Sequence, residues 1–121
     1  MSVSSEDLAQ VAAAREVVIE TRSGDRVTGT VIWVVVEDEK VYVRSVRGTP
    51  GRWYQRALAE PDVTLRVGGN RLRFRAVPAD DDESVERASE GLRRKYPKGR
   101  SLDSMLRPEV LRTTLLLEPL D

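Results

Sequence analysis

The chain has 121 residues, 40% apolar and 33% charged, a balance typical of a folded globular domain rather than of a disordered segment. It contains no cysteine and no histidine, which excludes disulfides, thiolate metal sites and every Ser-His or Cys-His catalytic pair. The formal net charge is zero, which argues against bulk attraction to nucleic acid or to a membrane.

These properties predict a single domain over residues 1–121, with no metal site and no nucleic-acid or membrane partner. The amino-terminal segment has neither a basic start nor an apolar stretch, so no signal peptide is predicted. The longest apolar run, residues 31–36, is too short to span a bilayer. We therefore expect a cytoplasmic protein.

The predicted elements begin with a short helix, because Ser4 and Asp7 have the spacing of a capping box. β-Branched residues and turn signals predict strands over residues 16–22, 27–37 and 41–46. Thr49 and Pro50 predict the cap and first position of a helix that ends near Glu60. The remaining predictions are strands at 62–67 and 70–79, a helix at 80–96, a helical turn at 101–106 and a strand at 110–117.

This order predicts an α+β fold with six mostly antiparallel strands. In so short a chain, that many strands favour a small closed or nearly closed β-barrel with flanking helices, because closure removes the sheet edges. An open α+β sheet is the alternative.

Charge is sorted along the chain even though the total is zero. Residues 44–75 carry eight arginines against Glu60 and Asp62 alone, and acidic residues dominate the segments on either side. The middle of the chain is therefore basic, and we looked there for a site that binds an anion.

The segment 41–60 combines three features that attract anions. The predicted strand carries Arg44, Ser45 and Arg47 to its end, and Gly48 and Gly51 leave the backbone accessible at the turn that follows. The helix after the turn directs unpaired amide groups toward the same place. Arginine side chains there, including Arg52, form bidentate bonds to phosphate. The alternative is that these arginines pair with Glu20, Glu37 or Asp62 on an ordinary surface.

Two tryptophans flank this segment. Trp53 lies one turn into the predicted helix, where it either shields a ring system or seals the end of the barrel. Thr30 and Trp33, on the preceding strand, are candidates for the same cleft.

The residues of this region resemble a known superfamily. The matching runs are Thr30-x-x-Trp33-Val-Val-Val, then Val41-Tyr-Val-Arg-Ser-x-Arg-Gly48, then Gly51-Arg-Trp-Tyr-x-Arg-Ala-Leu-Ala-x-Pro61. Together they are similar to the FMN-binding split-barrel superfamily, which includes pyridoxamine phosphate oxidase-like proteins and deazaflavin-dependent nitroreductases. The match is best over residues 15–79 and suggests a bacterial branch of that group.

The resemblance implies a split β-barrel that forms a homodimer and binds FMN or a deazaflavin in a groove. In that pattern Arg44, Ser45 and Arg47 hold the phosphate, Arg52 and Trp53 border the cofactor, and the strand from Thr30 to Trp33 lies beside the ring. The resemblance assigns no catalytic residue.

The leading functional hypothesis is therefore a flavin- or deazaflavin-dependent oxidoreductase with a small-molecule substrate that the sequence does not identify. Such a cofactor performs the electron transfer itself, which is compatible with a chain that lacks histidine and cysteine. The alternative is a cofactor-free barrel dimer that acts as a binding or scaffold module. Single-stranded nucleic-acid binding by the basic segment is a weaker third hypothesis, because stacking aromatic residues are scarce there.

Overall fold

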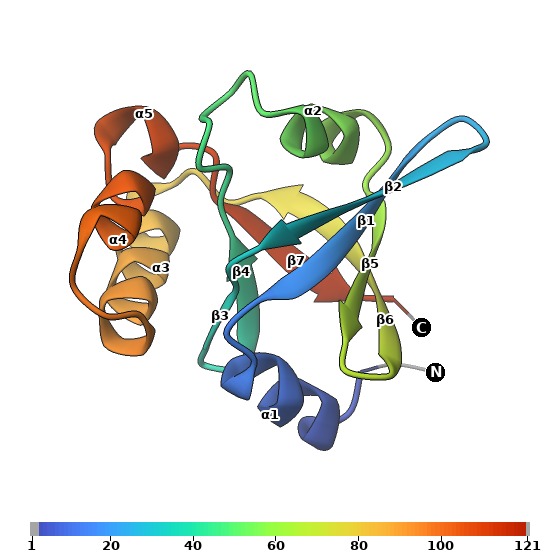
Figure 1. Ribbon diagram of the computed structural model, residues 1–121, viewed down its shortest axis with the longest axis horizontal. Helices are drawn as coiled ribbons and strands as arrows, with labels where there is room; N and C mark the ends of the chain where they lie inside the picture. The colour runs from blue at the N-terminus through green and yellow to red at the C-terminus, as the bar shows by residue number, and fades with distance from the viewer. Residues whose placement is uncertain (1–2, 121) are drawn as a thin grey trace.

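The structure is a computed structural model that describes residues 3–120 (Figure 1). In chain order its elements are α1 (Ser5–Ala13), β1 (Val17–Ser23), β2 (Arg26–Ile32), β3 (Val35–Glu37), β4 (Lys40–Val43), α2 (Arg52–Ala59), β5 (Asp62–Val67), β6 (Asn70–Pro78), α3 (Asp82–Lys95), α4 (Arg100–Met105), α5 (Pro108–Leu111) and β7 (Leu115–Pro119). The Ser4 capping box at the start of α1 is confirmed.

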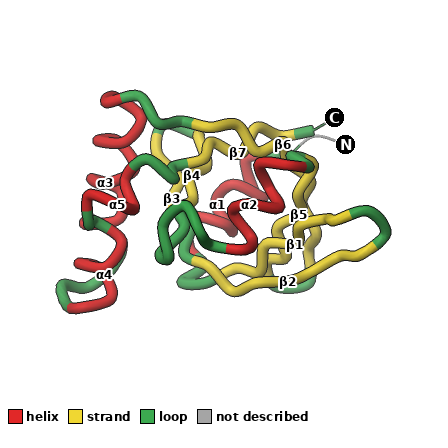
Figure 2. The backbone as a smooth tube through the Cα atoms, turned by 90° about the horizontal axis from the view of Figure 1, so that it is seen from above, coloured by secondary structure: helices red, strands yellow, loops and turns green. Residues whose placement is uncertain are grey.

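The strands form one antiparallel sheet in the order β2-β1-β5-β6-β7-β4-β3, and the sheet curls into a half-barrel. Helices α1 and α2 lie at opposite ends of the curled sheet, while α3, α4 and α5 gather on one side of it (Figures 1 and 2). The predicted α+β class and barrel-like sheet are confirmed.

The main core fills the inside of the curled sheet. Strand β6 alternates between its two faces, because Leu72 and Phe74 are buried while Arg71, Arg73 and Arg75 are exposed. A second apolar cluster lies on the outer side of β3 and β4, where Tyr42 packs with residues of α3 and α4 such as Leu92 and Met105. Both faces of β4 are therefore buried.

The prediction of six strands is wrong, because the segment 27–37 forms two strands rather than one. The break falls at Trp33 and Val34, whose backbone groups leave the sheet. The Val34 N–H donates to the Tyr96 hydroxyl (3.1 Å), and the Val34 carbonyl accepts from the Lys95 ammonium (2.6 Å). Side chains at the end of α3 thus satisfy the backbone where the strand is interrupted.

Several boundaries also differ from the predictions. Strand β4 ends at Val43 rather than at residue 46, and α2 begins at Arg52 rather than at Pro50. The segment predicted as a strand over 110–117 begins as the last part of α5, and β7 starts only at Leu115. In the first two cases, the tight turn that ends in Gly51 takes up residues assigned to its neighbours.

Lys95 makes the stability of the fold depend on pH. Burial lowers the pKa of Lys95 from 10.5 to about 8. Between these values the unfolded chain holds a proton that the folded protein has released, so the free energy of unfolding rises as pH increases through this window. We expect the difference in unfolding free energy between wild type and Lys95→Met, measured with urea, to grow in favour of wild type from about pH 8 to pH 10. A difference that stays constant over this range would contradict the assignment.

Candidate active site

The turn between β4 and α2 is held by its own backbone. The Gly48 N–H donates to the Ser45 carbonyl (2.9 Å), and the Gly51 N–H donates to the Gly48 carbonyl (3.1 Å). Gly48 has a positive φ of 74°, which favours glycine there. Gly51 is the N-cap residue of α2 and makes no side-chain hydrogen bond. The first N–H groups of the helix are therefore not bonded to a capping side chain.

Gly51 is required for space rather than for its backbone angles. A Cβ atom at this position would overlap the Ser45 hydroxyl, which itself donates to the Gly48 carbonyl (2.7 Å). We therefore expect Gly51→Ala to lower the free energy of unfolding by about 1–3 kcal/mol through overpacking. In a Ser45→Ala background the same change should cost clearly less, since the overlapping atom is absent. A double-mutant cycle in urea measures this coupling, and additive effects would contradict it.

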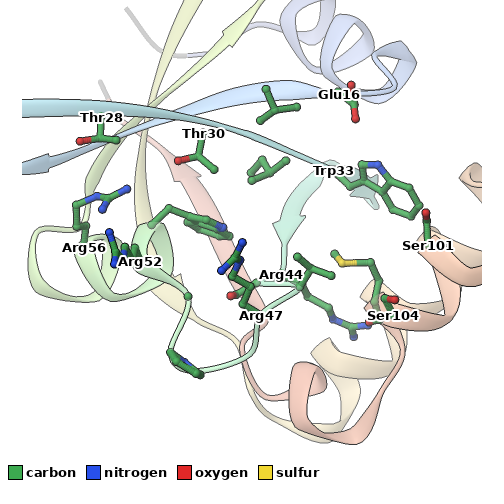
Figure 3. A pocket seen from close by; sticks show the side chains of 18 residues that line it. Glu16, Thr28, Thr30, Trp33, Arg44, Arg47, Arg52, Arg56, Ser101 and Ser104 are labelled. Carbon is green, nitrogen blue, oxygen red and sulfur yellow. The ribbon is translucent and has the colours of Figure 1, made fainter.

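A cleft of about 800 Å³ opens beside this turn (Figure 3). Its walls come from the end of β2, the turn and start of α2, and helix α4. All seven residues predicted for the site line it, namely Thr30, Trp33, Arg44, Ser45, Arg47, Arg52 and Trp53. The volume lies within the usual range for small-molecule sites.

Arg44 does not extend toward the turn as expected. Its side chain is only 2% exposed and is directed to the helices outside the sheet. The guanidinium donates to Thr114 Oγ1 (2.8 Å), to the carbonyls of Met105 (3.1 Å) and Val85 (2.7 Å), and to Ser89 Oγ (2.8 Å). Four of its five N–H groups are therefore used within the protein, and the predicted convergence of Arg44 with Arg47 on one phosphate is corrected.

Arg44 is also charged without a carboxylate partner among the described residues. Burial is the main reason that its pKa falls from 12.5 to about 10, and the nearby charge of Arg93 acts in the same direction. At neutral pH it remains a cation, and it joins the strand end to three other segments.

The hydrogen bonds of Ser45 also stabilise the turn. Its backbone N–H donates to Thr113 Oγ1 (3.0 Å), and its hydroxyl proton is committed to the Gly48 carbonyl. Ser45 is buried, and its hydroxyl has no proton left to donate to a phosphate.

The remaining arginines of the cleft are free of ion pairs. Arg47 and Arg52 are exposed, and neither has a carboxylate partner or a side-chain hydrogen bond within residues 3–120. Arg56, which the sequence analysis did not select, lies one turn further along α2 and donates to Thr21 (2.8 Å). The expected alternative, pairing with Glu20, Glu37 or Asp62, does not occur, because those carboxylates bind other arginines.

The cleft is therefore positive. Its lining includes four arginines and a single acidic residue, Glu16, which gives a formal charge of +3. Guanidinium groups without carboxylate partners and the open start of α2 together favour an anionic ligand.

The two tryptophans occupy different environments. Trp53 is 7% exposed and belongs to the main core, where its ring meets Tyr54 edge to face. Trp33 is half-buried and stacks on Tyr96 with ring centroids 3.8 Å apart and planes 2° from parallel. Trp33 therefore presents an aromatic ring that a neighbouring ring already holds in place, whereas most of Trp53 is used for packing.

The sequence analysis missed Glu16, Ser101 and Ser104, which line the same cleft. The two serines belong to α4, and nothing local in the sequence indicates that this short helix approaches β2. The position of Glu16 could have been predicted, because Glu16 immediately precedes β1. In a hairpin of β1 and β2, the start of β1 lies beside the end of β2.

The family of the chain follows from a comparison of sequences. A family model described as "Uncharacterized protein conserved in bacteria (DUF2255)" matches residues 7–117. The chain belongs to this family. Among curated proteins, none matches the DUF2255 chain in sequence.

Solved structures identify the fold. A candidate pyridoxamine 5'-phosphate oxidase from Listeria innocua superposes with a TM-score of 0.70 at 16% identity, covering 96% of this chain and 92% of that one. The FAD binding protein from Mycobacterium smegmatis gives 0.67 at 13% identity, with 100% and 93% covered. An F420-H2 dependent reductase gives 0.66 at 18% identity, with 86% and 94% covered. The resemblance to the split-barrel superfamily is confirmed as a similarity of fold.

Within the described residues of this DUF2255 chain, no helix is both long and apolar enough to cross a membrane.

Proposed function

We propose that the chain binds a flavin-type cofactor, FMN or a deazaflavin, in the cleft beside the β4–α2 turn and acts as an oxidoreductase. The observation that carries the proposal is the pair Arg47 and Arg52, two guanidinium groups without carboxylate partners at the open start of a helix. The neighbours named for FAD binding and for F420-H2-dependent reduction support the same class of ligand.

The residues of the cleft fit such a cofactor. Arg47, Arg52 and the first amides of α2 would hold the phosphate, and Arg56 adds a third positive charge along the same helix. The missing Cβ of Gly51 leaves room for the Ser45 hydroxyl, which holds the turn before this helix. Thr30 and Trp33 would border the ring from the end of β2.

The cofactor and the protein would have different roles, because the chain has no histidine and no cysteine. A bound flavin or deazaflavin supplies the hydride or electron chemistry. The protein contributes binding and orientation, because its cleft is lined by arginines and the chain has no imidazole or thiol. Arg44 and Ser45 would act indirectly, by fixing the strand end and the turn from which Arg47 projects.

We further propose that the active form is a homodimer. Strand β2 pairs only with β1, so its other edge is open among the described residues. Two of its side chains, Val27 and Val31, are 48% and 60% exposed, and Val31 also lines the cleft. A second copy would cover this edge and complete the cleft.

The direct test is an absorption spectrum of freshly purified protein, followed by titration with FMN and with the deazaflavin F420. We expect bound cofactor that gives the protein a visible colour, or saturable uptake of one of the two. A colourless protein that takes up neither would overturn the proposal.

One observation favours the second candidate, a cofactor-free binding or scaffold module. Arg44 and Ser45, which the family pattern assigns to the phosphate, are both committed to protein groups. On that account Arg47→Ala and Arg52→Ala leave stability unchanged and no flavin binds.

A further inference from the structure

The cleft has a second end with a different chemistry from the arginine end. Glu16 immediately precedes β1, and Trp33 immediately follows β2. The neighbouring strand residues Val17 and Ile32 are paired. The side chains of Glu16 and Trp33 therefore start from the same end of the β1–β2 hairpin. Both residues line the cleft, and Figure 3 shows them on the same side of it, away from Arg52 and Arg56.

Glu16 is the only acidic side chain in the lining, and it is not used elsewhere. It is exposed and makes no ion pair or side-chain hydrogen bond with any described residue. Burial is the main reason that the pKa of Tyr96, on which Trp33 stacks, is raised, and the charge of Glu16 acts in the same direction. A carboxylate without an ion-pair partner among the described residues therefore lies at the same end of the cleft as an indole ring that Tyr96 holds in place.

Two cations, Lys95 and Arg15, lie near the aromatic pair, and neither forms an ion pair with Glu16. The Lys95 ammonium donates to the Val34 carbonyl (2.6 Å) and contacts the Val11 carbonyl (3.5 Å), so it is tied to the backbone at the strand break. Arg15 is exposed and forms no ion pair with Glu16. No side chain among residues 3–120 therefore pairs with the carboxylate of Glu16.

We infer that Glu16 and Trp33 form a subsite for a planar cation, such as a pyridinium or another protonated or quaternised aromatic nitrogen compound. The indole ring attracts a cation over its face, and the carboxylate adds a charge of opposite sign at the rim. The inference rests on the proposed function for the occupant of the arginine end, which would be the cofactor. The Glu16 end would then select the substrate.

The test compares two probes that differ in charge. The cation 1-methylnicotinamide and neutral nicotinamide are titrated into the full chain, and binding is followed by the indole N–H resonance of Trp33, which is assigned by its loss in Trp33→Phe. We expect the cation to bind roughly fivefold more tightly than the neutral amide and to shift the Trp33 resonance more than that of Trp53.

Two variants show whether Glu16 causes the preference for the cationic probe. Glu16→Gln should remove the difference between the probes, whereas Glu118→Gln, an exposed carboxylate on β7 outside the cleft lining, should preserve it. Equal binding of the two probes to wild type, absence of binding, or a preference that survives in Glu16→Gln would overturn the inference. Titration of FMN into Glu16→Gln and into wild type distinguishes the two proposals. Unchanged FMN binding by Glu16→Gln, together with a lost preference for the cation, supports both proposals. Failure of FMN to bind wild type counts only against the cofactor proposal.

Discussion

Replacing Arg44 with methionine should lower the free energy of unfolding by about 3–5 kcal/mol. The change removes four hydrogen bonds and leaves the buried Met105 carbonyl, at the end of α4, without a donor among the described residues. Because the side chain is 2% exposed, water does not replace the lost donors. Urea unfolding followed by far-ultraviolet circular dichroism measures the effect.

Arg47 provides a matched control three residues away. It is exposed and makes no side-chain hydrogen bond or ion pair with the described residues, so Arg47→Met should change the free energy of unfolding by less than about 0.5 kcal/mol. Similar losses in the two variants, or none in Arg44→Met, would show that the buried network contributes no more than a surface residue does.

Removing both free arginines at the α2 start should have the largest effect on binding. We expect Arg47→Ala with Arg52→Ala to weaken FMN or F420 binding about a hundredfold, because two charge-assisted bonds to the anionic group are lost. Calorimetric titration measures the change, and stability should be nearly unaffected because neither guanidinium has a protein partner among the described residues.

Two further variants show what the arginines contribute. Arg75→Ala removes an exposed arginine on β6 outside the cleft and should leave affinity unchanged. Lysine at both positions 47 and 52 retains the charge but not the bidentate geometry, so its affinity should fall between those of wild type and the double alanine variant. An unchanged affinity in the double alanine variant would place the anionic group elsewhere.

Local signals in the sequence were sufficient to identify the cleft. Gly48, Gly51 and the arginines around them mark a strand, a turn and a helix start, and this order is a property of neighbouring residues. The capping box at Ser4 and the alternation in β6 are local in the same way. Most predictions that depended on nearby residues therefore agreed with the structure in type, except that the predicted strand 110–117 begins as helix α5.

The direction of the Arg44 side chain could not be predicted from its neighbours in sequence, because its hydrogen-bond partners lie in distant segments. Alternation along β4 places Arg44 on the same face as Tyr42, and the structure covers that face with α3 and α4. The groups that bind it, among them Val85 and Thr114, lie 41 to 70 positions away in sequence. A sequence analysis that places no helix over the outer face of β4 leaves Arg44 free to reach the turn.

The break between β2 and β3 has the same origin. Residues 27–37 are uniformly suited to a strand, and nothing in them marks an interruption. Tyr96 and Lys95, which bond to Val34, come from the end of α3, more than sixty positions later. The stack of Trp33 on Tyr96 accompanies this break and fixes the ring at the edge of the cleft.

The central claim is that the anionic group of the cofactor is held at the start of α2 by Arg47 and Arg52. Calorimetric titration of the wild-type protein with FMN and with riboflavin, which has the same ring but no phosphate, tests it most directly. If FMN is the cofactor, we expect it to bind about a hundredfold more tightly than riboflavin, with the preference lost in the double alanine variant. Equal binding of the two, or an FMN preference that persists without these arginines, would contradict the claim.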